Sequence, residues 1–179
     1  MKKIISGLFI SLDGVAEAPG DWHFPYFNDE MGAAVDAIWS RSDTMLLGRK
    51  SWQEFASFWP DNPDVEGADV MNGTRKVVVS STLDNVDAWQ NSTLLTGDPI
   101  EAVTELKAGP GKNISMSGSL TLTRALLQAK LVDELHLLIH PIALGSGARL
   151  FDGGEHVPLQ LLSSTTFSTG VLHTIYAPA

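Results

Sequence analysis

The segment from Asn113 to Phe151 constrains the fold more than any other part of the chain. It begins with an apolar run of strand length that ends at Gly118-Ser119, and a segment with helical periodicity follows. A second strand-like run then ends at Pro141, before a glycine-rich turn. This order of elements indicates an α/β protein. Small residues where a strand meets a helix also let a ligand approach the free N–H groups of that helix, which favour an anion such as phosphate.

Apolar runs of strand length alternate with amphipathic segments of helix length along the whole chain. We expect strands over residues 3–10, 44–47, 76–79, 93–96, 113–116, 134–140, 157–166 and 171–176. We expect helices over residues 29–41, 49–57, 99–107 and 120–129, the third with Asp98 as its N-cap. The polar segment 60–73 indicates a surface loop. Helices between the early strands and a terminal hairpin predict a mostly parallel sheet with antiparallel C-terminal strands, in one domain of residues 1–179.

The acidic composition limits the partners that the protein can have. A net charge of −9 and a pI near 4.8 argue against nucleic acid, whose phosphates demand a basic face. The chain has no cysteine, which excludes disulfides, cysteine nucleophiles and thiolate zinc sites. No apolar run approaches the ~20 residues of a membrane span. The apolar start of the chain meets Asp13 at once, so it predicts a buried first strand rather than a secretory signal, and we expect a cytoplasmic protein.

Two further junctions between a strand and a polar or helical segment carry groups suited to phosphate. After Gly48 the predicted helix begins with Arg49 and Lys50, where the helix dipole disfavours cations and a bound anion would relieve the conflict. The strand 76–79 ends in the three hydroxyls of Ser80–Thr82. Each feature has a simpler reading, as solvent-facing side chains or as a turn. Ligands of open α/β sheets gather beyond the carboxyl ends of the strands, however, so the three junctions support one another.

The loop after the first strand is rich in aromatic and acidic side chains. They are Asp21, Trp22, His23, Phe24, Tyr26, Phe27, Asp29 and Glu30. Such a loop beside a sheet end could clamp a flat heterocycle, and a carboxylate next to it could manage the proton of a reaction. Two alternatives remain open. The aromatic residues could cover the core, and Asp29 could cap the following helix.

Signatures of several other sites are absent. The chain contains no G-x-G-x-x-G fingerprint, no phosphate loop and no serine nucleophile elbow. His136 and His140 have the spacing of metal ligands on a helix, but their segment is predicted to be a strand, on which they would lie about 13 Å apart. We therefore expect no metal site, and a place at the core edge or in solvent for both histidines.

Six short motifs, taken in order, resemble the dihydrofolate reductase-like superfamily, in particular the group related to the C-terminal reductase domain of the bifunctional riboflavin biosynthesis enzyme. They are Ser11–Gly14, Leu46–Trp52, Val78–Ser81, Met116–Ser119, Leu131–Leu135 and Pro141–Phe151. The resemblance implies a three-layer α/β/α fold and NADPH as hydride donor. It also implies a stand-alone reductase, because the zinc site of the deaminase half needs two cysteines. In one departure, Ser119 stands where many relatives carry a second glycine.

The resemblance further implies roles for individual residues. The pyrophosphate would be held by Gly48, Arg49, Lys50 and Ser51 together with Gly118, Ser119, Leu120 and Thr121. The 2′-phosphate of the adenosine ribose would meet Ser80 and Ser81, helped by Arg49 or Lys50. Ala16 would lie near the nicotinamide. The substrate would contact Leu12, Asp13, Trp22 and Phe27, and its proton would be managed by Asp29 or Glu30.

We therefore expect an NADPH-dependent reductase of a small heterocyclic or ribosylamino-pyrimidine substrate, similar to 5-amino-6-(5-phosphoribosylamino)uracil reductase. The alternatives are dihydrofolate or pteridine reduction on the same fold, or a non-catalytic NADP-binding protein. Related reductases often pair. The strand 134–140 and the hairpin 157–176 offer sheet edges that need covering, so we also expect a homodimer.

Overall fold

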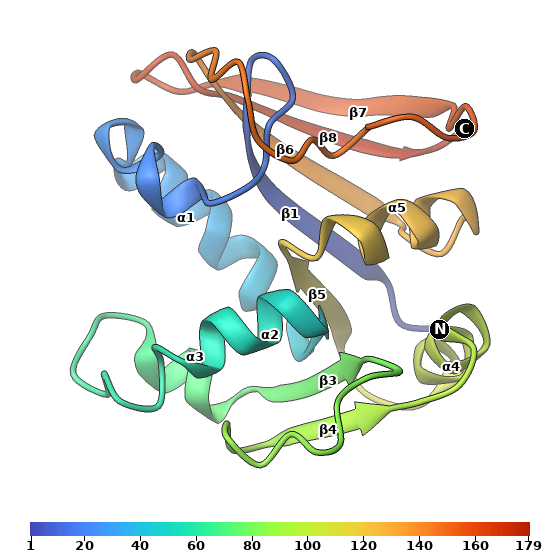
Figure 1. Ribbon diagram of the computed structural model, residues 1–179. Helices are drawn as coiled ribbons and strands as arrows, with labels where there is room; N and C mark the ends of the chain where they lie inside the picture. The colour runs from blue at the N-terminus through green and yellow to red at the C-terminus, as the bar shows by residue number, and fades with distance from the viewer.

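The computed structural model describes residues 1–179 and is built around one eight-stranded sheet (Figure 1). Its strands are β1 (Ile4–Ser11), β2 (Ser42–Gly48), β3 (Arg75–Val79), β4 (Ser92–Leu95), β5 (Asn113–Ser117), β6 (Glu134–His140), β7 (Leu159–Thr166) and β8 (Leu172–Pro178). They lie in the order β4-β3-β2-β5-β1-β6-β8-β7. The first six are parallel, whereas β8 is antiparallel to β6 and β7 is antiparallel to β8. The predicted mostly parallel sheet with antiparallel C-terminal strands is confirmed.

Five helices cover both faces of the sheet. They are α1 (Asp29–Trp39), α2 (Arg49–Ala56), α3 (Ala68–Gly73), α4 (Pro99–Ala108) and α5 (Leu120–Gln128). Two short 3₁₀ turns, Pro19–Asp21 and Phe24–Tyr26, lie in the loop after β1. One apolar cluster joins alternate strand residues to α4 and α5, and two others join the opposite residues to α1, α2 and α3. This alternation of side chains produces the predicted three layers.

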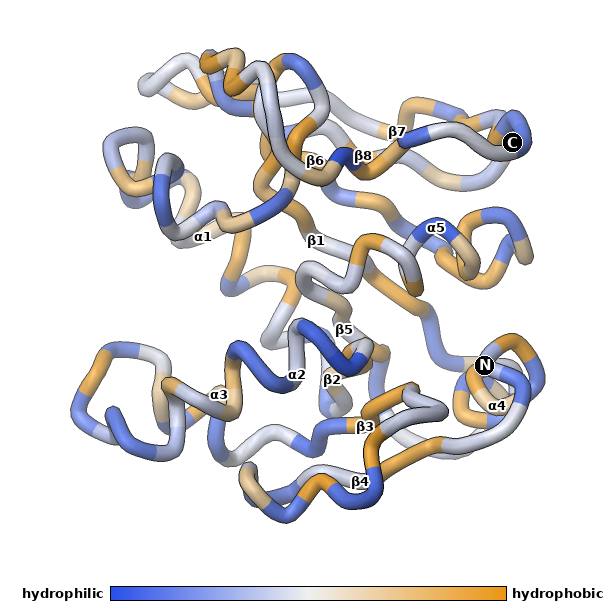
Figure 2. The backbone as a smooth tube through the Cα atoms, viewed as in Figure 1, coloured by the Kyte–Doolittle hydropathy of each residue, from blue (hydrophilic) through white to orange (hydrophobic).

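Apolar side chains are concentrated on the strands at the centre of the molecule (Figure 2). Glycine at position 7 lets α1 lie close to β1, because a Cβ atom there would come within 2.9 Å of Ile38 Cδ1. No helix in the structure is long and apolar enough to span a lipid bilayer.

The segment 60–73 differs from its prediction, because its second half forms α3 rather than a loop. Tertiary contacts hold this short helix. The ammonium of Lys76, fully buried, donates to the carbonyl oxygens of Met71 and Asn72, at 2.9 Å each. The Asn72 side chain also accepts a hydrogen bond from the Trp89 indole at 2.7 Å. These contacts are made by a polar side chain and by a residue 17 positions away, neither of which the spacing of apolar residues in the segment reveals.

The helix starts were predicted with mixed success. Asp98 caps α4 as expected, since its side chain accepts from the backbone N–H groups of Ile100 and Glu101. At α1 the cap is Asn28, whose side chain accepts from Met31 N at 3.0 Å, so the alternative role of Asp29 as N-cap is wrong. Asn28 and Asp29 are both good caps, and only the backbone conformation distinguishes them.

The sheet opens between its two central strands. β1 pairs with β5 only as far as Gly7 and Ser117, whereas it pairs with β6 up to Ser11 and His140. Beyond Gly7 the neighbouring edge of β1 therefore has no strand beside it. A crevice at the carboxyl ends of parallel strands, where neighbouring strands diverge, is the usual ligand position in an α/β sheet.

A buried polar network lies at the other end of these strands. The Glu134 carboxylate accepts from Lys3 Nζ and Arg41 Nη2, both at 3.0 Å, and contacts His136 Nε2 at 3.3 Å. Burial alone would raise the pKa of Glu134, but these hydrogen bonds outweigh it and lower the pKa to about 2. His136 and His140 are both buried, contrary to the expected place at the core edge or in solvent.

Replacing Glu134→Gln should lower the free energy of unfolding at pH 7 by about 1–2 kcal/mol, since Lys3 and Arg41 stay partly solvated when their partner is lost. The folded pKa of Glu134 lies near 2 and the ordinary value is 4.5, so its stabilisation is complete above pH 4.5 and is lost as the pH falls towards 2. Urea unfolding at pH 7 and pH 3 measures both effects, with the exposed Glu101→Gln as control. An equal loss of stability on acidification in wild type and Glu134→Gln would contradict this assignment.

Candidate functional site

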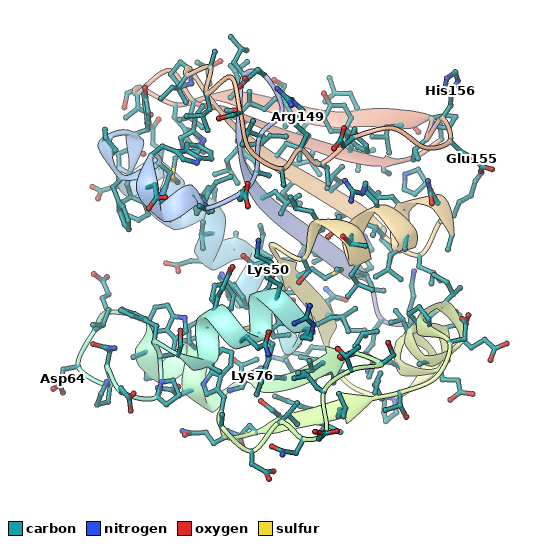
Figure 3. The ribbon with its side chains drawn as sticks, in the orientation of Figure 1. Lys50, Asp64, Lys76, Arg149, Glu155 and His156 are labelled. Atoms are coloured by element: carbon teal, nitrogen blue, oxygen red, sulfur yellow. The ribbon has the colours of Figure 1, made fainter.

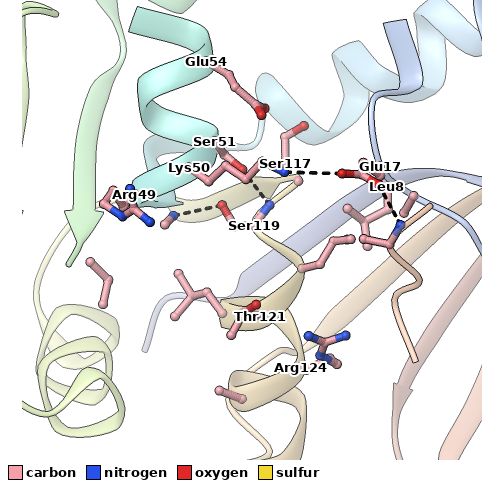
Figure 4. A pocket seen from close by; sticks show the side chains of 18 of the residues that line it. Leu8, Glu17, Arg49, Lys50, Ser51, Glu54, Ser117, Ser119, Thr121 and Arg124 are labelled. Atoms are coloured by element: carbon pink, nitrogen blue, oxygen red, sulfur yellow. Dashed lines mark hydrogen bonds and ion pairs between the residues drawn. The ribbon is translucent and has the colours of Figure 1, made fainter. Parts of the chain in front are cut away.

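A cavity of about 780 Å³ opens where the sheet splits. It lies between the N-termini of α2 and α5, at the carboxyl ends of β2, β3 and β5 (Figure 4). Its volume is in the range typical of small-molecule and cofactor sites. The three junctions that the sequence singles out, at Gly48, at Ser80 and at Gly118, all contribute to its wall.

Every residue predicted to bind the cofactor lines this one cavity. These residues are Ala16, Gly48, Arg49, Lys50, Ser51, Ser80, Ser81, Gly118, Ser119, Leu120 and Thr121. They come from four separate stretches of the chain, which the parallel sheet brings to the same edge. Their role towards a cofactor stays a prediction, but their assembly in one place is a property of the fold.

Two serine hydroxyls join the N-termini of α2 and α5. Ser119 N donates to Ser51 Oγ at 2.8 Å, and Gly48 N donates to Ser119 Oγ at 2.9 Å (Figure 4). Ser119 adopts a left-handed conformation with φ of 52°, which is unfavourable for a residue other than glycine. Its hydroxyl hydrogen bond to Gly48 N–H offsets part of that cost.

The first-turn amides of both helices remain available to a ligand. The serine pair uses the N–H groups of Gly48 and Ser119, which precede the helices. The N–H groups of the first turn have no acceptor within their own helix, and the positive end of the helix dipole lies there. Two such helix N-termini facing one cavity can bind two phosphate groups.

The cations at the start of α2 lie in different settings. The Arg49 guanidinium makes one hydrogen bond, to Gln53 in the same helix at 3.3 Å. Lys50 Nζ instead lies 3.5 Å from Glu17 Oε1. The other oxygen of Glu17 accepts from Ala148 N at 2.8 Å, and this bond, with Lys50, lowers the pKa of Glu17. The Lys50–Glu17 pair therefore connects α2 to the loops after β1 and β6.

Two further arginines line the cavity from α5 and from the loop after β6. Arg149 lies on the loop after β6, above Lys50 in the view of Figure 3. Its Nε donates to Asp13 O at 3.1 Å. Arg124 donates to the carbonyl oxygens of Arg149 and Leu150. Both cations thus fix the loop after β6 against the body of the protein.

The residues predicted to contact substrate do not line the cavity. Leu12 is 69% exposed and Phe27 is 51% exposed, both outside it. The Trp22 indole donates to Glu17 O at 3.1 Å. The Asp13 carboxylate accepts from Ser11 Oγ and from two backbone N–H groups of the loop after β6, which hold its pKa well below the usual range. The Asp13 carboxylate therefore joins the loop after β1 to the loop after β6.

The two predicted proton-managing carboxylates also lie away from the cavity. Asp29 is exposed at the first position of α1. Glu30 accepts from the backbone N–H and the hydroxyl of Ser168, each at 2.8 Å, and from Asn28. These bonds lower the pKa of Glu30 and attach α1 to the turn between β7 and β8. Neither carboxylate lines the cavity, and their role in proton transfer stays a prediction.

The aromatic residues of the loop after β1 mainly cover the core, as the simpler reading proposed. The His23 ring stacks on Phe9 with centroids 4.4 Å apart. Trp22 and Tyr26 pack edge-on against His140, which is fully buried. Burial lowers the pKa of both histidines, so they are neutral at pH 7.

Some lining residues have no distinguishing signal in the sequence. Gly7 and Phe9 lie in the middle of β1 and are accessible only because the strands diverge there. Glu54 and Phe55 lie one helical turn beyond Ser51, on the side of α2 that faces the cavity. Helical periodicity from Lys50 and Ser51 would have located these two, since residues three or four apart share a face.

Replacing Gly118→Ala should disrupt the junction of α2 and α5. Gly118 has φ of +66°, and an added Cβ would lie 2.9 Å from Ser51 Oγ, which must then leave Ser119 N. We expect the free energy of unfolding to fall by roughly 1–2 kcal/mol. Chemical denaturation measures the change. Gly73→Ala is the matched control, because an added Cβ there meets nothing within 4 Å. A loss no greater than that of the control would show that the junction tolerates a side chain.

Comparison with known proteins identifies the family. The chain matches the model of the RibD C-terminal domain over residues 2–173. It is 34% identical to the uncharacterized protein YyaP of Bacillus subtilis, over 98% of this chain and 94% of that protein. A putative riboflavin biosynthesis protein from Shewanella sp. PV-4 has a similar structure, with a TM-score of 0.80 at 22% identity over 100% of this chain and 99% of that one. For a pyrimidine reductase-like protein from Corynebacterium diphtheriae the TM-score is 0.72 at 17% identity, over 99% and 92% of the two chains. The predicted resemblance is thereby confirmed, and the chain belongs to the RibD C-terminal domain family.

Proposed function

We propose that this protein is an NADPH-dependent reductase of a small heterocyclic substrate. The observation that carries the proposal is the assembly of three phosphate-suited junctions around one cavity. That cavity has four basic and three acidic side chains in its wall, although the chain as a whole has a net charge of −9. A local excess of cations on an acidic protein favours an anionic ligand at that place.

The residues present fit a dinucleotide phosphate. The first turns of α2 and α5 would hold the pyrophosphate. Gly48 and Gly118 have no side chain, so the pyrophosphate could approach the backbone closely there. Arg49 would pair with the 2′-phosphate, because its guanidinium makes no ion pair of its own. Ser80 Oγ accepts from the N–H groups of Thr82 and Leu83, both at 3.1 Å, and its hydroxyl hydrogen could turn from Thr82 Oγ1, 3.4 Å away, to that phosphate.

Bound NADPH would supply the hydride. The chain would position it and exclude water, with Ala16 close to the nicotinamide and the crevice between β1 and β5 as the path to the substrate. The names of the similar structures, a putative riboflavin biosynthesis protein and a pyrimidine reductase-like protein, support a nitrogen heterocycle as the acceptor. The accompanying proton would come from solvent or a group in the cavity wall rather than from Asp29 or Glu30.

Two alternatives predict different behaviour. A dihydrofolate or pteridine reductase would oxidise NADPH with a pterin, and a non-catalytic NADP-binding protein would bind NADPH but oxidise it no faster with any pterin or pyrimidine. A steady-state screen of NADPH oxidation, followed by absorbance, separates these outcomes from reduction of a ribosylamino-pyrimidine.

Titration of the five tryptophans with each nucleotide tests the cofactor assignment. We expect wild type to bind NADPH at micromolar concentration and NADH at least about tenfold more weakly, from one charge-assisted pair at the 2′-phosphate. Arg49→Ala should weaken NADPH binding about tenfold and NADH binding less than about twofold. Arg75→Ala, an exposed arginine at the start of β3, is the control. Equal losses for both nucleotides would rule out Arg49 as the 2′-phosphate ligand.

We also propose that two copies pair through the C-terminal hairpin. The outer edge of β7 has no strand beside it, and Leu161 and Leu162 on this strand are each 52% exposed. An exposed apolar edge strand favours association with a second chain.

Light scattering after gel filtration tests the pairing. We expect twice the chain mass of 19.3 kDa for wild type, and a single chain for Leu162→Lys, because a buried ammonium would oppose the contact. Glu101→Lys, which introduces a lysine on the distant α4, serves as control and should remain a dimer. A monomeric wild type would refute the proposal.

A further inference from the structure

The charges in the substrate half of the cavity point to a class of substrate. Resting on the function proposed above, we propose that Glu54 selects a neutral or cationic heterocycle and rejects one that carries a phosphate or carboxylate close to the ring. The relevant region, here called the α2 compartment, is the part of the cavity between α2 and β1. Its wall is formed by Gly7, Phe9, Ser51, Glu54, Phe55 and Ser117.

The α2 compartment lies on one face of the sheet. Gly7 and Phe9 alternate with Leu8, and Gly7 pairs with Ser117 of β5, so these three residues share the face that α1 and α2 cover. Glu54 and Phe55 project from the second turn of α2 into the same region. Ser51, in the first turn of α2, is where the compartment adjoins the site proposed for the phosphates, whereas Ser80 and the first turn of α5 line other parts of the cavity.

Glu54 is the uncompensated charge of this compartment. Its carboxylate takes part in no hydrogen bond or ion pair, unlike that of Glu17, which is bound by Lys50 and by Ala148 N. In Figure 4 the Glu54 carboxylate points toward the side where Glu17 lies, whereas Arg49 extends away from both. If Lys50 turned to a phosphate of the cofactor, Glu17 would lose its counter-charge as well. The compartment therefore stays negative in either arrangement of Lys50.

The other two cations of the cavity wall are engaged on the loops after β1 and β6. The guanidinium of Arg149 is held by Asp13, and that of Arg124 by backbone carbonyl oxygens of the loop after β6. Glu54 is exposed in the absence of ligand, but a ring bound beside it would displace the water between the two groups, so a second negative charge within several ångströms would weaken binding by roughly tenfold or more. A ring with N–H donors, by contrast, would pack between Phe9 and Phe55 and donate to the carboxylate.

The test compares two ligands with the same ring. Binding of 6-hydroxymethylpterin, which is neutral, and of pterin-6-carboxylate is measured by calorimetry on the full chain with saturating NADP⁺. We expect wild type to bind the neutral pterin at least about tenfold more tightly. Glu54→Gln should reduce that preference to about threefold or less, and Glu54→Lys should reverse it. Asp36→Asn removes one charge from an exposed position of α1 outside the cavity and should leave the preference unchanged.

The outcomes separate this inference from the proposed function. An unchanged preference in Glu54→Gln, or a wild type that favours the carboxylate, overturns the role of Glu54 while NADPH binding stands. Failure of both pterins to bind to an NADP⁺-saturated protein overturns the compartment as a heterocycle site. If the tryptophan titration detects no nucleotide binding, the proposed function itself is wrong. Circular dichroism confirms that each variant, altered at an exposed helix position, is folded.

Discussion

The divergence of β1 from β5 beyond Gly7 and Ser117 is the constraint on which the rest of the structure depends. Up to that point the two strands are held by the sheet ladder, and beyond it β1 continues with β6 alone. The helix starts of α2 and α5 lie above the gap, joined by the hydrogen bonds of Ser51 and Ser119. One break in strand pairing thus determines where backbone amides, hydroxyls and cations can meet.

Charge is unevenly distributed within the cavity that this break creates. Arg49 extends away from Glu17 and Glu54, and Lys50 is paired with Glu17. The clamps formed by Asp13 and Arg149 keep the loops after β1 and β6 together without adding a free charge to the interior. The phosphates of a cofactor would bind near Arg49, and an acceptor ring without a phosphate would bind near Glu54.

The features that local sequence determines were predictable, and those that depend on distant partners were not. The helix starts at Gly48 and Gly118 follow from small residues after apolar runs, and the parallel sheet follows from the order of elements. The helix α3 depends in part on Trp89, whose indole donates to Asn72 from 17 residues further along the chain. Asp29 and Glu30 have the right chemistry for proton transfer, but Ser168 of the distant hairpin engages Glu30, and Asp29 points outside the cavity. Gly7 and Phe9 were not predicted, because the sequence of β1 alone does not reveal where its pairing with β5 ends.

The reciprocal serine pair has a consequence for how this family can vary. Each hydroxyl satisfies an amide of the other junction, so a change at position 51 or 119 alters the hydrogen bonding of both helix starts. A glycine at 119 would relieve the left-handed backbone but leave Gly48 N–H without its acceptor, and loss of the Ser51 hydroxyl would leave Ser119 strained and half satisfied. The two sites are therefore epistatic. Their coupling also preorganises the two helix ends as a single rigid unit, whose ordering is completed during folding rather than when a ligand arrives.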